Sequence, residues 1–401
     1  MRVFYGLGIR VFYAVMWLAA RFHAKAKKWI DGRKIPLSTY RVPADKQVVW
    51  FHCASLGEFD QGLPVMNAYK EAYPDTFLVV TFFSPSGMEF YHKRDHRVDL
   101  ALYLPLDTKY RAQKFIAHFH PKQVFFVKYE FWYNHLKCAR RDGAKIYGVS
   151  SLFRPSHRFF KWYGGFFRKA LRLFDHFYTQ DLRSKDLLNS IGIDQVTVTG
   201  DTRYDRMLAV KENSRENEVI RTFVGDKPVL ILGSSWTIDE EILLPALFEL
   251  RQQFKIIIAP HDISEKHLQQ IAAEFDNEVE WYTTFQNLGK DILVLNTIGQ
   301  LTNAYQYADL AYIGGGFTGK LHNILEPGAF GIPVFFGPKF ARFPEAQLFL
   351  DHEVAFTIED SYSFEKAVEE ALGKRARIKE KLAEIFARNQ GAAKKIIRSL
   401  S

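Results

Sequence analysis

Cysteine is scarce in this chain of 401 residues, which contains only Cys53 and Cys138. Two cysteines cannot form a disulfide framework, and neither stands at the spacing of a metal-ligand pair. The 13 histidines are scattered, and His261 and His267 do not form the His-Glu-x-x-His pattern of zinc enzymes. We therefore expect a protein of a reducing compartment that holds no metal.

The sequence also shows no internal repeat and no low-complexity segment. Hydrophobic residues make up 47% of the chain, so it can bury substantial cores and is not disordered. A length of 401 residues exceeds one ordinary core and predicts two domains of about 150–200 residues each. Aromatic residues reach 15%, a fraction that suits both cores and lipid interfaces.

The net charge of +9 is concentrated at the amino terminus. Residues 1–34 hold eight basic residues and one acidic residue, a net charge of +7, which leaves only +2 for the rest of the chain. Nucleic-acid-binding proteins carry a basic surface on the folded body. The nearly neutral body therefore argues against a nucleic-acid partner.

The amino-terminal segment is hydrophobic and then basic. Residues 3–20, VFYGLGIRVFYAVMWLAA, are apolar apart from Arg10, and RFHAKAKKWIDGRK follows. A helix of 18 residues reaches about 27 Å, barely a hydrocarbon core, and a mid-helix arginine opposes spanning. We predict a membrane-associated helix within residues 1–34 that lies in the cytoplasmic leaflet, with its basic residues on anionic headgroups.

Three other interpretations of this segment stay open. A secretory signal peptide fits less well, because the basic start is weak and no small-residue cleavage site precedes the basic stretch. A buried helix that covers the first domain and a single-pass anchor are the other two.

The body alternates short apolar runs with helical patterns, which predicts an α/β fold with parallel sheets. We expect two Rossmann-like, doubly wound domains that face a cleft, at residues 35–208 and 227–401. The polar residues 209–226 are predicted to link them, and solvated helices are expected from about residue 361. The predicted strands are 48–52, 77–82, 100–104, 123–127, 145–149 and 196–199, then 228–232, 254–259, 292–295, 310–313, 334–336 and 354–357.

Ligands of such folds bind where strands end, so the loops after strands are the candidate sites. Residues 52–58, His-Cys-Ala-Ser-Leu-Gly-Glu, follow the first strand, and Ser55 and Gly57 suit a tight turn into a helix predicted at 59–73. Glu58 would open that helix, where its dipole favours a carboxylate. Two roles stay open for Glu58: a helix cap, or a general base that takes a proton from an attacking hydroxyl.

A glycine-rich block, GGGFTGKLHNILEP, occupies residues 314–327 after another strand. Its glycines, including Gly315 and Gly316, allow a phosphate to approach backbone N–H groups, and a helix is expected to begin near Asn323. Glu326 could accept hydrogen bonds from two ribose hydroxyls. The block is not a Walker loop. A structural turn is the alternative interpretation.

Small or polar residues end two more strands of the second half. Ser234 and Ser235 leave room for a ligand beside the strand end, and His261 could present its ring to an anion. A single histidine at a strand end is more often structural, and that alternative stays open.

Two segments of the first half complete the candidates. Arg203 or Arg206, in residues 200–206, could bind a carboxylate or phosphate, or could form an interdomain salt bridge. Residues 130–132, Glu-Phe-Trp, follow a strand and are expected to serve partly in packing.

Together these motifs resemble the 3-deoxy-D-manno-octulosonic acid (Kdo) transferases, bacterial enzymes that glycosylate lipid A precursors. Residues 314–327 with Gly337-Pro338 are the most specific match, because His322-Asn323, Leu325-Glu326-Pro327 and the later Gly-Pro keep the family's spacing. Weaker matches are residues 52–58 (family His-Ala-x-Ser-x-Gly-Glu), 130–132 (Glu-x-x-Trp-Pro), 151–158 (Asn-Ala-Arg-x-Ser) and 200–205 (Gly-Asn-x-Lys-x-Asp).

The resemblance implies a GT-B enzyme that uses CMP-Kdo without a cofactor or metal and inverts the anomeric carbon. The acceptor would be a lipid A precursor at the cytoplasmic face of the inner membrane, as in lipopolysaccharide biosynthesis. By the same resemblance, Glu58 is the catalytic base and Ser55, Gly57 and Arg154 bind the acceptor. The implied donor-binding residues are Ser234, Ser235, His261, Gly315, Gly316, Asn323, Glu326 and Arg203.

The chain departs from the family pattern at several places, including Asp201 and Arg203, which replace an asparagine and a lysine. Trp236 replaces a common histidine, Gln300 replaces a glutamate, Tyr133 replaces a proline, and His261 lacks the arginine that commonly precedes it. Two rival functions also stay open: a GT-B transferase with a UDP-sugar donor, and a non-catalytic lipid-binding protein that uses the same amino-terminal helix.

Overall fold

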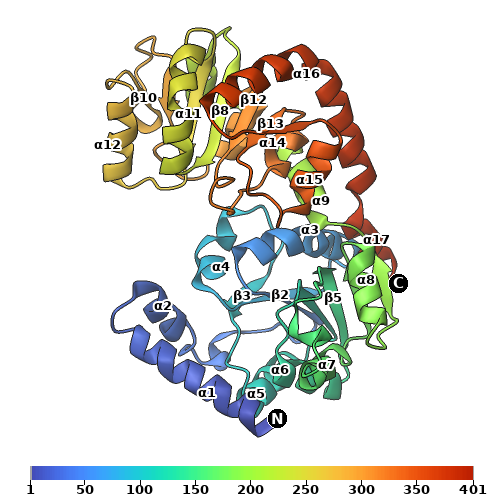
Figure 1. Cartoon of the computed structure of the whole chain (residues 1–401). Helices are drawn as coiled ribbons and strands as arrows, with labels where there is room; N and C mark the ends of the chain where they lie inside the picture. Colours follow the sequence, from blue (N-terminus) through green and yellow to red (C-terminus); the bar gives the residue numbers. More distant parts are fainter. Residues whose placement is uncertain (1, 401) are drawn as a thin grey trace. The chain divides into compact units, whose positions relative to one another are not determined.

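The computed structural model describes residues 2–400 and divides into two compact units (Figure 1). Unit 1 contains the described residues up to 206 and those from 389 onward, and unit 2 contains residues 207–388. The chain passes between the units within helix α9 (Thr202–Glu212) and at the end of α16 (Ser361–Asn389).

Unit 1 is built on a parallel sheet of seven strands in the order β3-β2-β1-β4-β5-β6-β7. The winding direction reverses beside β1, which pairs with β2 on one side and β4 on the other. Such a switch point opens a crevice at the carboxyl ends of the strands. The strands are β1 (Val48–Cys53), β2 (Phe77–Phe82), β3 (Leu100–Tyr103), β4 (Gln123–Val127), β5 (Lys145–Ser151), β6 (His176–Thr179) and β7 (Val196–Val198).

Helices cover both faces of this sheet, so its strands are apolar on both sides. Phe51 packs with α3 and α17 on one face, and Trp50 packs with α5 and α6 on the other. The helices are α1 (Arg2–Ala19), α2 (Ala24–Gly32), α3 (Leu56–Ala72), α4 (Pro85–Phe90), α5 (Lys109–Phe119), α6 (Tyr133–Arg141), α7 (Gly165–Leu171), α8 (Leu182–Asn189) and α17 (Ala392–Arg398).

Unit 2 repeats the design with a parallel sheet ordered β10-β11-β9-β8-β12-β13-β14, and its winding reverses beside β8. Its strands are β8 (Val229–Ser235), β9 (Lys255–Pro260), β10 (Glu280–Trp281), β11 (Ile292–Val294), β12 (Leu310–Ile313), β13 (Val334–Phe336) and β14 (Ala355–Thr357). Its helices, besides α9 and α16, are α10 (Glu218–Val224), α11 (Thr237–Leu250), α12 (Glu265–Glu274), α13 (Leu301–Ala304), α14 (Leu325–Ala329) and α15 (Pro344–Asp351).

The α/β class with parallel sheets is confirmed, and each of the twelve predicted strands is present with ends shifted by at most three residues. The sequence prediction missed β6 and β10, which have four and two residues. Two helices begin elsewhere than predicted: α3 begins at Leu56, and α14 begins at Leu325, two residues after Asn323.

The units differ from the predicted domain bounds at two places. Residues 209–226, predicted as a linker, form the end of α9 and α10 in unit 2. Helix α17, predicted in the second domain, belongs to unit 1, where Ile396 is buried with the residues of α3. The Asp205 carboxylate accepts the backbone N–H groups of Gly391 and Ala393 and so caps the start of α17.

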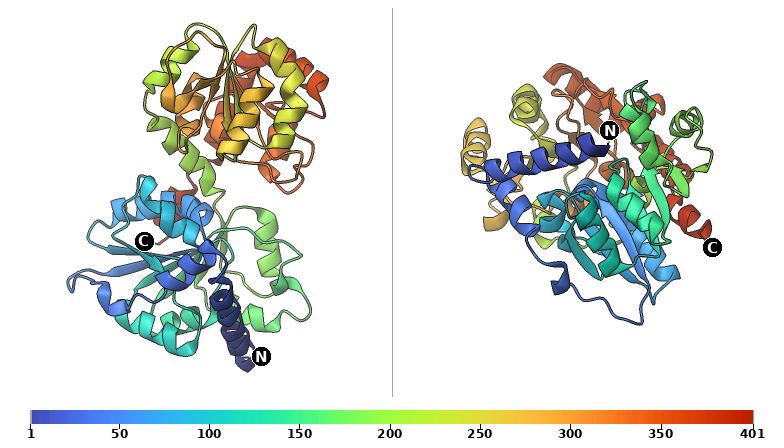
Figure 2. Two further views of the ribbon diagram at one scale, coloured as in Figure 1. Left: turned by 90° about the vertical axis from the view of Figure 1, so that its left-hand side faces the viewer. Right: turned by 90° about the horizontal axis from the view of Figure 1, so that it is seen from below.

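The amino-terminal segment forms two helices, α1 and α2, rather than one. Helix α1 lies on unit 1 beside α5 and α6 (Figures 1 and 2). Its inward side chains include Tyr5 and Ile9, and Trp29 and Ile30 of α2 are buried in the same cluster. Among residues 2–400, no helix combines the length and the apolar character needed to cross a membrane.

A buried polar cluster fastens α1 to the unit. The Asp107 carboxylate, after β3, accepts the Tyr5 hydroxyl at 2.5 Å, His135 Nδ1–H at 2.6 Å and the backbone N–H groups of Asn134 and His135. Burial raises the pKa of Asp107, but these hydrogen bonds outweigh burial, so that the pKa lies below its ordinary value.

We predict that Asp107→Asn lowers the free energy of unfolding by about 1–3 kcal/mol at pH 7, because buried donors lose their charged partner. Since the folded-state pKa is depressed, the stabilisation is present above about pH 4 and is lost as the pH falls through the folded-state value. Urea unfolding of unit 1 at pH 7 and pH 3 checks this. An equal loss at both pH values, or an equal loss in the exposed control Asp45→Asn, would contradict it.

Candidate active site

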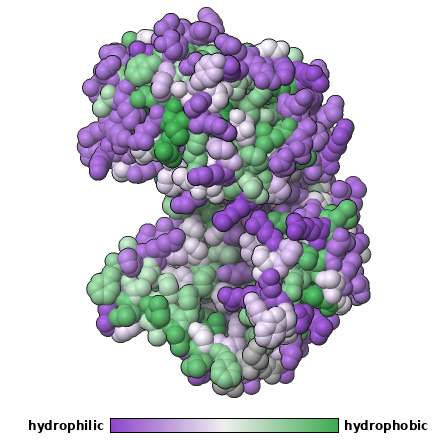
Figure 3. All heavy atoms as spheres, viewed as in Figure 1, coloured by the Kyte–Doolittle hydropathy of each residue, from purple (hydrophilic) through white to green (hydrophobic). Residues whose placement is uncertain are grey.

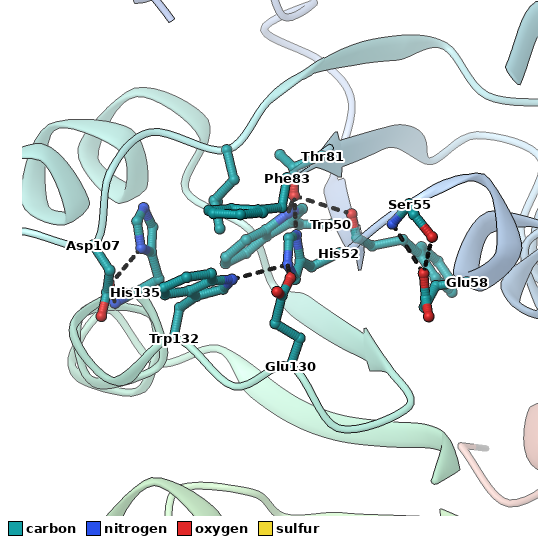
Figure 4. Close-up of polar contacts among 12 residues, drawn as sticks. Trp50, His52, Ser55, Glu58, Thr81, Phe83, Asp107, Glu130, Trp132 and His135 are labelled. Atoms are coloured by element: carbon teal, nitrogen blue, oxygen red, sulfur yellow. Dashed lines mark hydrogen bonds and ion pairs between the residues drawn. The ribbon is translucent and has the colours of Figure 1, made fainter. Parts of the chain in front are cut away.

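Glu58 lies at the carboxyl end of β1, beside the switch point of unit 1 (Figure 4). It is the third residue of α3, and its Oε2 accepts the Ser55 backbone N–H at 3.0 Å and the Ser55 hydroxyl. Ser55 is the N-cap of α3, so the two residues form a capping box. The capping interpretation of Glu58 is therefore confirmed, and it fixes the direction of the carboxylate.

The second oxygen of Glu58 faces a cation. Lys128 Nζ lies 3.9 Å from Oε1, and the Glu58 side chain remains 19% exposed. Lys128 directly follows β4, and its backbone is left-handed with φ of 65°. Left-handed geometry costs a non-glycine residue energy and clusters at functional sites. The loops after β1 and β4 thus place a carboxylate and an ammonium together at the switch point.

A second network joins β1 to the loop after β4 (Figure 4). His52, buried in β1, lies 3.2 Å through Nε2 from Glu130 Oε2 and accepts the Trp132 indole N–H at 3.1 Å. Its Nδ1 lies 2.9 Å from the hydroxyl of Thr81, on β2. Residues 130–132 are therefore not only packing: Glu130 and Trp132 are held against the strand that leads to Glu58.

The other two predicted acceptor residues, Gly57 and Arg154, have few close neighbours within unit 1. A Cβ on Gly57 would meet nothing nearer than Ser55 Oγ at 3.8 Å, so packing within unit 1 does not demand glycine there. Arg154 is exposed in the loop after β5, where its backbone N–H contacts His157 Nδ1 at 3.4 Å.

In unit 2 the buried carboxylate of Asp239, on α11, joins the loops at the switch point between β8 and β12. It accepts the backbone N–H of Trp236 at 2.9 Å, that of Gly315 at 3.0 Å and the Tyr312 hydroxyl at 2.6 Å. Burial and the Asp239 charge both raise the pKa of Tyr312, which stays a neutral donor. Asp239 thus holds the glycine-rich block against the loop that contains Ser234.

The glycines of that block allow two backbone segments to touch. A Cβ on Gly314 would meet Ser234 O at 2.2 Å, and one on Gly316 would meet Gly337 N at 2.4 Å. Gly315 has φ of 88° and gives its N–H to Asp239. The structural-turn interpretation therefore holds for these glycines, and the N–H of Gly315 already has a partner inside unit 2.

The predicted donor residues of unit 2 gather around the same loops. Ser234 is left-handed with φ of 53°, and the Ser235 hydroxyl donates to Glu240 at 2.6 Å. Glu326 accepts the hydroxyl of Thr302, and Asn323 caps the backbone N–H of Leu325 at 3.2 Å. Arg203 belongs to unit 1, where its Nε donates to Asp201 at 2.8 Å.

Trp236 organises two histidines of unit 2. Its ring stacks on His261 with centroids 4.2 Å apart, and its indole N–H donates to His322 Nε2 at 3.1 Å. Indole N–H is only a donor, so Nε2 of His322 accepts and its proton resides on Nδ1. Burial, with a smaller contribution from His261, lowers the pKa of His322 to about 4. The departure at Trp236 therefore sets the proton position of a neighbouring histidine.

The sequence prediction missed several residues of the two candidate sites. Lys128, Asp239 and Thr302 acquire their roles only through contacts with residues far along the chain. Lys128 could have been found from the sequence, because it directly follows a buried strand and precedes Glu130, at the place where ligands of such folds bind.

The comparisons with solved structures give the class of fold. A glycosyltransferase from Rickettsia africae ESF-5 superposes with a TM-score of 0.58 at 14% identity, over 88% of this chain and 97% of that one. A UDP-GlcNAc 2-epimerase from Neisseria meningitidis superposes with a TM-score of 0.64 at 13% identity, over 88% and 99%. Together with the two doubly wound sheets, these similarities place the protein in the GT-B class of α/β folds.

The sequence comparisons show which family the chain resembles. Residues 28–206 match the family model described as 3-deoxy-D-manno-octulosonic-acid transferase. The Kdo transferase of Chlamydophila psittaci (strain ATCC VR-125 / 6BC) is 29% identical over 79% of this chain and 75% of the relative. That of Aquifex aeolicus (strain VF5) is 25% identical over 85% and 91%. The chain is thus similar in sequence to Kdo transferases along most of its length.

We predict that ¹⁵N NMR of histidine-labelled protein finds His322 neutral from pH 5 to pH 8, protonated on Nδ1, and titrating near pH 4. Trp236→Phe keeps a ring against His261 but removes the indole N–H, so His322 should then populate both tautomers. Trp281→Phe, a partly buried tryptophan elsewhere in unit 2, should leave the His322 signals unchanged. A wild-type His322 protonated on Nε2 would contradict the assignment.

Proposed function

We propose that this protein transfers Kdo from CMP-Kdo to the primary hydroxyl of a lipid A precursor, a phosphorylated and acylated glucosamine disaccharide, with inversion at the Kdo anomeric carbon. The observation that carries this proposal is the Glu58 carboxylate, oriented by Ser55 at the switch point of unit 1 and faced by Lys128. Residues 28–206, which match the family model, include all three residues.

In the proposed mechanism, Glu58 accepts the proton of the acceptor hydroxyl as its oxygen attacks the anomeric carbon and CMP departs. The capping box directs Oε2 toward the helix start, so Oε1 is the oxygen proposed to take the proton. Lys128, beside Oε1, would then meet the negative charge of the acceptor's phosphate or of the donor's carboxylate. Ser55, Gly57 and Arg154 are proposed to contact the acceptor.

For the donor, we propose that the residues gathered at the switch point of unit 2 receive CMP. Gly315 and Gly316 would shape the loop that receives the phosphate, with Asn323 beside it, while Glu326 would hold the ribose. Ser234, Ser235 and His261 complete this donor set, and we assign Arg203 to the Kdo carboxylate or the phosphate. No metal or cofactor is required by this scheme, because neutral and cationic donors would stabilise the leaving phosphate.

We further propose that α1 holds the enzyme at the cytoplasmic face of the inner membrane. Hydrophobic side chains gather over α1 on the face seen in Figure 3. Phe4, Leu7, Val11, Val15 and Leu18 are each more than half exposed, and their spacings of three and four residues align them in one stripe. This stripe lies opposite Tyr5 and Ile9, which face unit 1, so α1 can pack on the protein and enter a lipid surface together.

Not all basic residues of the segment serve such a surface. Arg33 points into unit 1, where it donates to the carbonyls of Trp29, Phe83 and Leu104. Burial lowers its pKa to about 9. The remaining basic residues of α1 and α2 are the ones proposed to meet anionic headgroups.

We predict that Glu58→Gln lowers kcat by about 10²–10⁴-fold, the usual contribution of a positioned base. Glutamine can still accept the Ser55 N–H, so the thermal stability should change little. The measurement incubates full-length protein with a CMP-Kdo generating system and a tetraacylated disaccharide bisphosphate, and reads product mass. Near-normal turnover by the variant would overturn the base assignment.

Donor competition separates this function from its rivals. Inhibition by CMP but not by UDP supports the Kdo donor, and the reverse result favours a UDP-sugar transferase. No product mass gain by folded wild-type protein, with CMP-Kdo shown to be present, would favour the lipid-binding alternative or the UDP-sugar transferase.

We predict that Leu7→Glu, within the exposed stripe, lowers co-sedimentation with vesicles of anionic phospholipid at least tenfold. A carboxylate there opposes both insertion and attraction to anionic headgroups. The control Leu182→Glu changes a comparably exposed leucine on α8 and should sediment like the wild type. Equal sedimentation of both variants would contradict the role of α1.

A further inference from the structure

Unit 1 contains a cavity of about 460 Å³ that none of the proposed roles uses. It lies between Tyr5 of α1, the residues that follow β4, the loop after β5 and helix α7. Eight of its 13 lining residues are Phe, Tyr or Trp. Its volume falls in the range of about 300–1,000 Å³ that small-molecule sites occupy.

The aromatic lining suits an apolar occupant. Phe166 and Ala170, on α7, are buried and form one wall, and Phe167 and Phe159 are partly buried beside them. Aromatic side chains bury large apolar areas at little entropic cost, and transfer of each methylene from water into such a place is favourable by about 0.8 kcal/mol.

The charged side chains that line the cavity belong to the loops after β4 and β5. His157 and Arg158, in the loop after β5, and Glu130, after β4, are the titratable groups other than tyrosines that line the cavity. Arg154 precedes them in the same loop. An apolar cavity with basic residues on one loop fits a molecule that has a long alkyl chain and an anionic group.

The cavity is also placed for a ligand that comes from a lipid surface. Tyr5 lines it from the inward side of α1, the helix whose opposite side presents Phe4 and Leu7 to solvent. Glu130 and Trp132 line it as well, and both contact His52, on the strand that leads to Glu58 (Figure 4). One cavity thus adjoins the exposed apolar helix and the network behind the proposed base.

We infer that this cavity is an acyl-chain site, which receives one fatty-acyl chain of the phosphorylated acceptor lipid while its sugar lies toward Glu58. The inference rests on the proposed function for the identity of the lipid. The site would hold one acyl chain in the cavity beside α1. The lipid would then leave the membrane only as far as its reacting hydroxyl must move to reach Glu58.

Binding of alkyl phosphates tests the cavity without Kdo transfer. Isothermal titration of full-length protein with decyl, dodecyl and tetradecyl phosphate, each below its micelle concentration, should show one saturable site. Affinity should rise about fourfold per methylene, as the transfer energy requires. Inorganic phosphate alone should bind at least a hundredfold more weakly. Equal affinity for all three chains would overturn the inference.

Ser156→Trp is the variant that addresses the cavity. Ser156 is exposed and lines the cavity, so a tryptophan there should obstruct it without disturbing the core, and should weaken tetradecyl phosphate binding at least tenfold. Ser190→Trp places the same ring at an exposed position outside the cavity and should bind like the wild type. Circular dichroism melts of both variants report on folding.

Leu7→Ser distinguishes the cavity from adsorption on α1. Adsorption predicts that Leu7→Ser weakens alkyl phosphate binding and that Ser156→Trp does not, and this result would overturn the inference. Alkyl binding that is lost in Ser156→Trp, in a protein that makes no Kdo product, would leave the acyl-chain site standing and overturn only the proposed transfer.

Discussion

The rest of this structure depends on one constraint of parallel sheets: a strand order that reverses must open a gap at the carboxyl ends of two neighbouring strands. In unit 1 the reversal lies between β1 and β4, and in unit 2 it lies between β8 and β12. No helix or strand of the described chain fills these gaps, so the loops that border them contain short side chains, glycines and charged residues. The gap in unit 1 is bordered by Glu58 and Lys128, and the gap in unit 2 is bordered by Asp239 and Gly315.

The same constraint explains why the sheets could be predicted from the sequence. Strands buried on both faces, such as β4 and β9, contain nearly continuous apolar runs between polar loops. Strand β6 escaped prediction, because His176 and Thr179 flank only two apolar residues and it has no continuous apolar run like those of β4 and β9. The return of α17 to unit 1 escaped too, because its partner α3 lies more than 300 residues earlier and no local pattern records such a pairing.

The site was predictable in position and less so in contacts. Glu58, Ser55 and the glycine-rich block could be found because they follow strands. That Gly315 gives its N–H to Asp239 could not, since the acceptor belongs to α11, some 75 residues earlier. Sequence patterns mark where a ligand can approach, whereas tertiary contacts decide which N–H groups remain for it.

Trp236 shows how one such contact can offset a departure from the family pattern. At position 236, where the resemblance led us to expect a histidine, this chain has an indole that stacks on His261 and donates to His322. Three adjacent imidazoles would compete for protons, because each can donate or accept through either nitrogen. An indole N–H has one role, so it leaves His322 neutral with its proton on Nδ1. The loop therefore gains a fixed hydrogen-bond pattern at the point where the second unit's strands end.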